Sequence, residues 1–221
     1  MSDILYDKEM ECRYCGRKFK TKKTRISKIS VSKKDSDFCI HYTNKENPYY
    51  YEVWVCPHCS FAFNANFSEL KPAHKELINK EYIKRAGKID LCGPRTMDEA
   101  IRAYKLTLLC ASVSGQNSTT IAGLCLRIAW LYRFQAVKEE EVKYLVKAVH
   151  NFQEVYEHDD LTQNPLGEHK ILYLLGELNG RLGNYSETRR WFNLLLSQRN
   201  IEPAINHLVR DQWAEYKTSL T

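Results

Sequence analysis

The chain has 221 residues, of which 43% are hydrophobic and 27% are charged, a balance typical of a globular protein with a packed core. No apolar run approaches the ~20 residues that a membrane-spanning helix needs. The opening residues, MSDILYDKEMEC, lack the apolar centre of a signal peptide. The sequence therefore predicts a cytoplasmic protein with no membrane segment and either one large domain or two small ones.

The net charge of +6 is unevenly distributed along the chain. Residues 1–97 contain 19 basic and 12 acidic residues, whereas residues 98–221 contain 14 and 15. Within the first part, residues 13–34 hold ten basic side chains and no acidic one. The basic character therefore belongs to the N-terminal part.

The first 66 residues indicate strands and loops. Ile29 and Val31 alternate with polar residues, and the run YYYEVWVC at 49–56 predicts a strand with Tyr51, Val53 and Val55 on one face. Residues 67–95 indicate a helical linker. In it, Pro72 begins a helix that runs to about Arg85.

From residue 96 onward the pattern is helical. Thr96 and Glu99 have the spacing of a capping box at a helix start. In the fourth of the six helices, Ile171, Leu174, Leu178 and their neighbours follow one helical stripe. The sequence predicts helices near 97–114, 118–135, 138–158, 167–182, 186–199 and 203–217.

The segment LLGELNGRLGNYSETRRWFNLLL at 174–196 resembles a tetratricopeptide repeat, although Thr188 stands where a small Ala is usual. MDEAIRAYK at 97–105 and YLVKAVHNFQEVYE at 144–157 resemble the second helices of two further repeats. About three repeats are needed to bury a continuous core. The sequence favours a repeat-like helical stack over a plain helical bundle.

Two cysteine pairs carry the strongest chemical signal. Cys12 and Cys15 are separated by two residues, as are Cys56 and Cys59, and this spacing lets both sulfurs reach one ion at ~2.3 Å. Together the pairs provide the four thiolates of a structural Zn²⁺ site. The forty residues between the pairs exceed the usual fifteen to twenty, so the insert must leave the metal and return to it.

Other interpretations of these cysteines are weaker. A thioredoxin-like redox pair needs a strand–helix setting that neither stretch has, and a catalytic zinc would keep one coordination position open. Cys39 and His41 lie in the insert as FCIHY, and the sequence leaves open whether they contribute to a metal site. The simpler interpretation makes Cys39 a small buried hydrophobic residue.

These stretches together resemble a bacterial family catalogued as domain of unknown function 2225. The resemblance rests on CRYCGRKFKTKKTR, on the run from DSDFC to VWVCPHC, and on AIRAYKLTLLCA and LLGELNGRLGNYSETRRWF, and it covers nearly the whole chain. One departure is Ser60, where the family pattern usually has Gly. The resemblance implies a zinc-ribbon start and a helical-repeat end, and it assigns no activity.

The basic run supports an alternative function. Zinc ribbons with basic hairpins bind nucleic acid through phosphate contacts, but nearby cations also balance the charge of a tetrathiolate zinc, and lysines also blunt exposed sheet edges. Asp35 and Asp37 follow the run, and we expect them to form a turn or a salt bridge to its basic residues. The candidate nucleic-acid contacts are Arg17, Lys18, Lys20, Lys22, Lys23 and Arg25.

The sequence thus predicts an α+β protein, with a zinc-ribbon β domain at 1–66, a helical linker at 67–95 and a tetratricopeptide-like domain at 96–221. It contains no catalytic motif that we recognise. We expect a non-catalytic zinc-binding adapter that docks a protein or peptide in its helical groove, with oligomeric state and partner undetermined. Residues of the type that anchor partners are Tyr132, Arg133, Arg181, Arg189, Arg190 and Trp191.

Overall fold

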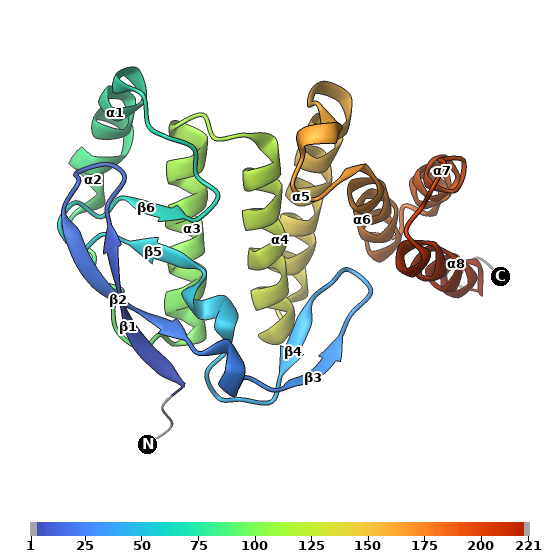
Figure 1. The fold of residues 1–221 in the computed structure, drawn as a ribbon, viewed down its shortest axis with the longest axis horizontal. Helices are drawn as coiled ribbons and strands as arrows, with labels where there is room; N and C mark the ends of the chain where they lie inside the picture. Colours follow the sequence, from blue (N-terminus) through green and yellow to red (C-terminus); the bar gives the residue numbers. More distant parts are fainter. Residues whose placement is uncertain (1–3, 219–221) are drawn as a thin grey trace.

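The computed structural model describes residues 4–218 and confirms the α+β class, with hairpins first and helices after them (Figure 1). Three antiparallel hairpins each form a separate two-stranded sheet. They pair β1 (Leu5–Glu11) with β2 (Lys18–Thr24), β3 (Val31–Lys34) with β4 (Ile40–Tyr42), and β5 (Val53–Val55) with β6 (Ala62–Asn64).

The predicted strand over 49–56 is wrong in its first half. Pro48–Tyr51 forms a 3₁₀ turn, in which the side chain of Asn47 accepts a hydrogen bond from the Tyr49 amide at 3.0 Å. Asn and Pro start this turn by capping it and by fixing φ. Only Val53–Val55 is extended, and all three of its residues are buried, so it shows no alternation between a buried and an exposed face. Val31 is likewise 58% exposed, not half-buried as the alternation around it suggested.

The helix expected from Pro72 to about Arg85 is present. Helix α1 (Pro72–Ile78) passes through a π turn at Asn79–Ile83 into α2 (Lys84–Ala86). The chain then leaves the helix at Gly87, whose φ of +63° favours glycine. Arg95 ends the linker and is buried, where it donates to the carbonyls of Leu91, Tyr50 and Val53 at 2.8 Å each.

The six predicted helices are all present, with ends within a few residues of those expected. Within residues 4–218, none of the helices combines the length and the apolarity needed to cross a lipid bilayer. The helices are α3 (Met97–Val113), α4 (Ser118–Phe134), α5 (Lys138–His158), α6 (Glu168–Arg181), α7 (Tyr185–Leu196) and α8 (Pro203–Thr218).

Successive helices pack as hairpin pairs, α4 on α5 and α6 on α7. A side-chain carbon at Gly176 would overlap the ring of Phe192 at 2.3 Å, so glycine lets α6 and α7 approach closely. Thr188, the departure from the repeat pattern, is fully buried, and its hydroxyl donates to the Gly176 carbonyl at 3.0 Å. The packing has the stacked arrangement expected of helical repeats, and the tetratricopeptide assignment itself stays a prediction.

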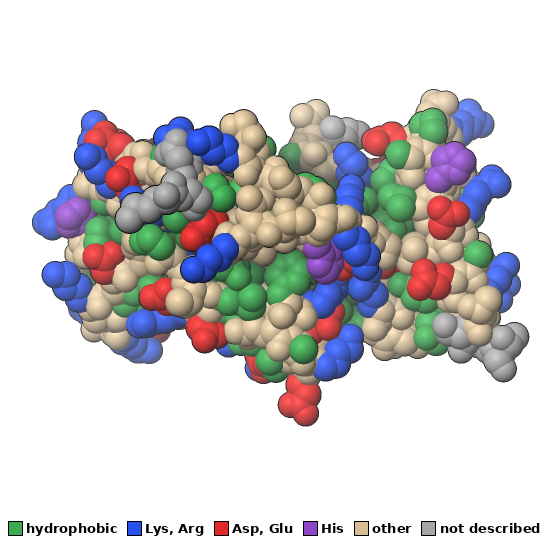
Figure 2. Space-filling model, turned by 90° about the horizontal axis from the view of Figure 1, so that it is seen from below, with side chains coloured by type: hydrophobic (Ala, Val, Ile, Leu, Met, Phe, Trp, Pro, Cys, Tyr) green, Lys and Arg blue, Asp and Glu red, His purple; other side chains and the backbone are tan. Residues whose placement is uncertain are grey.

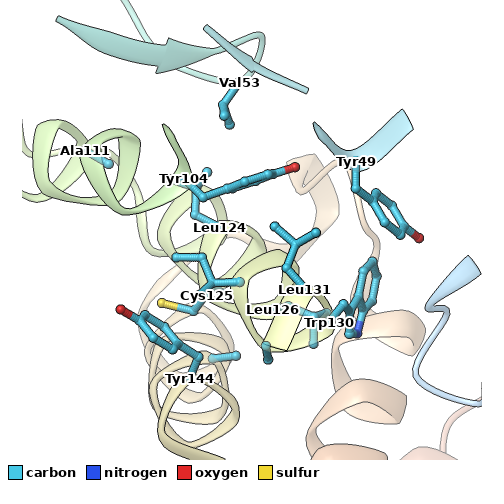
Figure 3. Packing of buried hydrophobic residues seen from close by; sticks show 14 of the residues in the cluster. Tyr49, Val53, Tyr104, Ala111, Leu124, Cys125, Leu126, Trp130, Leu131 and Tyr144 are labelled. Atoms are coloured by element: carbon cyan, nitrogen blue, oxygen red, sulfur yellow. The ribbon is translucent and has the colours of Figure 1, made fainter. Parts of the chain in front are cut away.

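The helices form a row, with β5–β6 beside α3 and the β3–β4 hairpin below α4 to α6 (Figure 1). Buried apolar residues from all three predicted segments belong to one cluster that runs from Cys12 to Val209. Figure 3 shows part of it, where Val53 of the hairpin segment lies near Tyr104 of α3 and Tyr49 lies beside Trp130 of α4. The division at residues 66 and 95 stays a prediction.

Candidate metal centre and acidic loop

The structure brings the four cysteines of the two pairs together. All four sulfurs lie within 4.8 Å of one another, with Cys12 to Cys59 at 3.6 Å and Cys15 to Cys56 at 3.8 Å. Four thiolates bound at ~2.3 Å around a tetrahedral ion would lie about 3.8 Å apart. A disulfide needs about 2.05 Å, and all four cysteines are free. The cluster is therefore a candidate metal site.

The two cysteine pairs sit on turns of the same construction. After the first pair, the Gly16 amide donates to the Cys12 carbonyl at 2.9 Å, and after the second the Ser60 amide donates to the Cys56 carbonyl at 2.8 Å. The Cys12 and Cys56 amides each donate to the carbonyl five residues on, at 3.0 and 2.9 Å. Both turns thus hold their sulfurs on the same side, as the knuckles of a zinc ribbon do.

Ser60 adopts the same backbone conformation in the second cysteine turn as Gly16 does in the first. Gly16 has a φ of +69° and Ser60 a φ of +62°, a region that a side chain makes unfavourable. The Ser60 hydroxyl offsets this by donating to the Gly87 carbonyl at 2.7 Å and accepting from the Ile89 amide at 3.1 Å. The serine therefore fastens the cysteine turn to the end of the helical linker.

The remaining cysteines lie apart from this cluster. Cys39, Cys110 and Cys125 are at most 1% exposed and belong to the core. Burial raises the pKa of Cys110 and of Cys125 to about 12, so both are neutral thiols. His58, inside the second turn, is exposed and lies 3.3 Å from the Lys18 carbonyl.

The loop between β3 and β4, residues 35–39 with the sequence DSDFC, is here called the acidic loop. Its Asp37 is fully buried against the helices. Arg133 of α4 holds both carboxylate oxygens, at 3.1 and 2.6 Å, and the Trp130 indole donates to one of them at 2.9 Å. Two-point Arg–carboxylate pairs are strong and directional, so this contact fixes the loop on α4.

The middle of the acidic loop lies on α6. The Tyr173 hydroxyl donates to the Ser36 carbonyl at 2.9 Å, and Arg181 donates to the Ser36 hydroxyl at 2.8 Å. That hydroxyl in turn donates to buried Glu177 at 2.6 Å. Burial raises the pKa of Glu177 above its ordinary value, although Arg181 favours its charged form. The loop therefore rests on both helices through buried polar contacts.

Asp35 carries the third set of contacts. Lys33 and His41 both approach its carboxylate at 2.8 Å and Arg133 approaches it at 3.0 Å. Burial disfavours its charge, but the bonds from His41 and Lys33 hold the pKa of Asp35 well below its usual range. Lys33 is the expected salt bridge to the basic run. The partner of Asp37 is instead Arg133, 96 residues away in sequence.

Asp35, Cys39 and His41 also place three ligand-type atoms within 4.8 Å of one another. Two features of this group disfavour a metal ion. The Arg133 guanidinium already lies on Asp35, and burial together with the nearby Asp37 charge raises the pKa of Cys39 to about 12. Cys39 is fully buried, as the simpler interpretation of the sequence expects.

Lysines of the basic run face acidic residues of β1, which precede the run in the sequence. In the β1–β2 register, Asp7 faces Lys22, Glu9 faces Lys20 and Glu11 faces Lys18. Lys22 lies 2.8 Å from Asp7, and Lys18 lies 3.4 Å from Glu9. On the face shown in Figure 2, acidic side chains lie among basic ones. The hairpin is thus a mixed-charge surface.

The remaining candidate contacts take different positions. Arg25 lies over the Tyr6 ring at 4.9 Å. Arg17, Lys18 and Lys20 are exposed, and Lys22 and Lys23 are half-buried. Arg13 donates to the carbonyls of Ala65 and Phe67. It therefore fastens the segment after the third hairpin to the first cysteine turn.

Among the predicted partner anchors, Arg133 and Arg181 are occupied by the acidic loop, and Trp191 is a core residue at 1% exposure. Arg189 and Arg190 are exposed. Sequence reasoning named the aspartates and the arginines separately but did not join them. In the sequence, these aspartates and arginines are related only by opposite charge, and charge alone does not specify which residues pair across about a hundred positions.

The chain belongs to the family described as "Uncharacterized protein conserved in bacteria (DUF2225)", whose model matches residues 5–216. This confirms the family to which the sequence stretches point. The comparison with curated proteins found no match, and neither did the comparison with solved structures.

Proposed function

We propose that Cys12, Cys15, Cys56 and Cys59 bind one structural Zn²⁺. Sulfur separations of 3.6 and 3.8 Å and two turns of identical hydrogen bonding support this assignment. Four thiolates fill a tetrahedral shell and leave no position for water or substrate. The ion would therefore join the first hairpin to the third.

We further propose that the chain is a non-catalytic adapter, and that its helical face binds an acidic segment of a protein partner. The observation that carries this proposal is the two-point contact of Arg133 with Asp37, extended by Arg181 at 3.6 Å from the same carboxylate. This face is built to hold an Asp-Ser-Asp segment, and the chain supplies one itself. A partner would bind by taking the place of the acidic loop.

The exchange has a defined energetic requirement. A loop tethered in the same chain competes at an effective concentration on the order of millimolar. A partner segment must therefore add contacts beyond the two aspartates. Exposed Arg189 on neighbouring α7 carries the same charge as Arg133 and Arg181 and could supply such a contact, whereas Arg190 is paired with Glu187 at 3.1 Å.

Binding in trans tests the adapter proposal. The probe is a synthetic peptide of residues 31–42, and the protein carries Asp35→Ala and Asp37→Ala together, which removes the loop's own carboxylates. We expect this variant to bind the peptide at least about tenfold more tightly than the wild type does, a difference of ~1.4 kcal/mol. Isothermal titration calorimetry measures both.

A matched peptide in which Asp37 is replaced by Asn provides the control. It keeps size and sequence but loses the charge that Arg133 contacts. Equal binding of the two peptides, or no binding to the loop variant while its zinc content and circular dichroism match the wild type, contradicts the proposal. Metal analysis of untagged protein tests the zinc assignment separately, and less than one equivalent of metal contradicts it.

Nucleic acid binding is not proposed, because acidic residues of β1 face lysines of β2 at three alternate cross-strand pairs. Neutralised lysines release few counterions from a phosphate backbone.

A further inference from the structure

A cavity of about 420 Å³ lies between the hairpin segment and helices α4 and α6. Its walls include the aromatic rings of Tyr42, Tyr49, Tyr104, Trp130 and Phe152. Small-molecule sites in proteins typically measure about 300–1,000 Å³ and are mostly apolar with a few converging polar groups. In Figure 3, Tyr104, Leu124 and Trp130 face the segment that carries Tyr49 and Val53. The cavity has the size and lining of a ligand site.

Arg127 is the cationic group of this cavity, and its orientation is fixed by the protein. Its Nε donates to a Glu52 carboxylate oxygen at 2.8 Å, and Tyr104 donates to the same oxygen at 3.1 Å. The guanidinium lies over the Trp130 ring at 4.3 Å and the Tyr49 ring at 4.9 Å. Such ring contacts hold a guanidinium flat and in place.

The two terminal nitrogens of Arg127 make no hydrogen bond with any residue in the range 4–218, since Nε alone contacts Glu52. The side chain is 32% exposed. A guanidinium with one edge occupied retains N–H groups that match the two oxygens of a carboxylate. Arg127 therefore presents the cavity with a pre-positioned donor pair that no hydrogen-bond acceptor of residues 4–218 receives.

Gly123 lies one helical turn before Arg127 on the same side of α4, and it lines the same cavity. A methyl group there would meet no other atom within 4 Å, so the packing of the chain does not require glycine. Glycine inside a helix costs about 1 kcal/mol relative to Ala. Its effect here is to leave the helix backbone open to the cavity beside the arginine.

From these three observations we propose that the cavity binds a small organic acid. The apolar or aromatic body of the ligand lies among the rings and over Gly123, and its carboxylate accepts hydrogen bonds from the terminal nitrogens of Arg127. A cationic ligand is disfavoured, because the free donors of Arg127 outnumber the one Glu52 oxygen that is left. Asp37 and Phe38 of the acidic loop also line this cavity, so the proposed site adjoins the contact of that loop with Arg133.

The test uses naphthalene-2-carboxylate and 4-phenylbutyrate as probes, with 2-naphthalenemethanol as the uncharged analogue. We expect the wild-type protein to bind one equivalent of at least one acid below about 1 mM. Gly123→Phe, which fills the open space, should abolish binding of the acids and of the alcohol. Arg127→Met should weaken acid binding at least about tenfold and change alcohol binding less than about twofold.

Leu109→Phe, on the exposed side of α3, is the matched control and should bind like the wild type. Thermal unfolding midpoints establish that each variant is folded. The proposal is overturned if neither acid binds the wild type at 1 mM, if Gly123→Phe binds as well as the wild type, or if Arg127→Met weakens the acid and the alcohol equally.

Discussion

The hairpin region, residues 5–64, and the helical region, residues 97–218, are stabilised in different ways. The strands of the hairpins have three to seven residues each, and every hairpin is a sheet of only two strands. Two-stranded sheets are marginal in water. The helices have 12 to 21 residues and bury apolar stripes against their sequence neighbours. The hairpins therefore depend on ties between distant residues, whereas the helices depend on local periodicity.

This difference teaches where single changes act strongly. In the helical region many similar contacts stabilise each helix, so a single side chain contributes a small part of the stability, as in other stacked helical arrays. In the hairpin region a few residues hold whole segments, among them the four cysteines and Asp37. Loss of one such residue frees a segment that has little stability of its own.

The largest effect is expected for Cys56→Ser. The variant should lose the proposed Zn²⁺ and the order of the hairpin region while α3 to α8 stay helical, because metal binding and folding are coupled in such modules. Metal analysis, near-UV and far-UV circular dichroism measure the three quantities. Cys92→Ser, outside the cluster, is the control and should keep its metal. A Cys56→Ser protein with unchanged near-UV spectrum and metal content contradicts the comparison.

The second effect concerns the tie between the two regions. Asp37→Ala should lower the free energy of unfolding by about 3 kcal/mol, because the half-buried Arg133 loses its two-point partner and keeps only the contacts with Asp35 and Glu141. A double-mutant cycle with Arg133→Met, followed by urea denaturation, isolates the pair. We expect the two losses to be clearly less than additive. Strict additivity means that the loop is held by other contacts.

A smaller effect is expected on acidification. The folded pKa of Asp35 lies below its unfolded value of about 3.9, so its contribution is complete above that pH and is lost as the pH falls towards the folded pKa. Denaturation at pH values from 6 down to about 3 measures the loss. Asp35→Asn should show a shallower decline than the wild type. Parallel curves show that Asp35 does not carry this dependence.

The smallest effect is expected for a substitution in the helical region. Thr96 caps α3, and its hydroxyl accepts from the Glu99 amide at 3.2 Å. Thr96→Ala should lower the free energy of unfolding by about 1 kcal/mol and leave metal content unchanged. Ser112→Ala, on the exposed side of the same helix, serves as control. A loss as large as that of Asp37→Ala would show that the helical region also depends on single residues.

The helices were predictable because their signals are local. Thr96 with Glu99 and the apolar stripe of Ile171, Leu174 and Leu178 each lie within a few turns of the helix that they specify. The cysteine cluster was predictable for a different reason, since the spacing within each pair identifies the chemistry whatever path the chain takes between them. The structure brings those pairs together across 41 and 47 residues.

The residues that the acidic loop contacts could not be predicted from the sequence. The pairing of Asp37 with Arg133, and of Ser36 with Arg181, depends on how the hairpin lies on the helices, and no periodic signal encodes that position. The cavity beside Arg127 was missed for the same reason, because its walls come from the 3₁₀ turn, α3, α4 and α6 at once. The short strands were misjudged where Asn47 and Pro48 replaced the expected extension with a turn.

The placement of Ser36 has a consequence for biosynthesis. Its hydroxyl contacts Arg181, 145 residues later in the chain, so the residues that receive the acidic loop are translated long after it. Until Arg133 of α4 and Arg181 of α6 have both left the ribosome, Asp37 and Ser36 stay in contact with water. We expect a ribosome-bound chain that stops at residue 160 to expose this loop to proteolysis, and a chain released at full length to protect it.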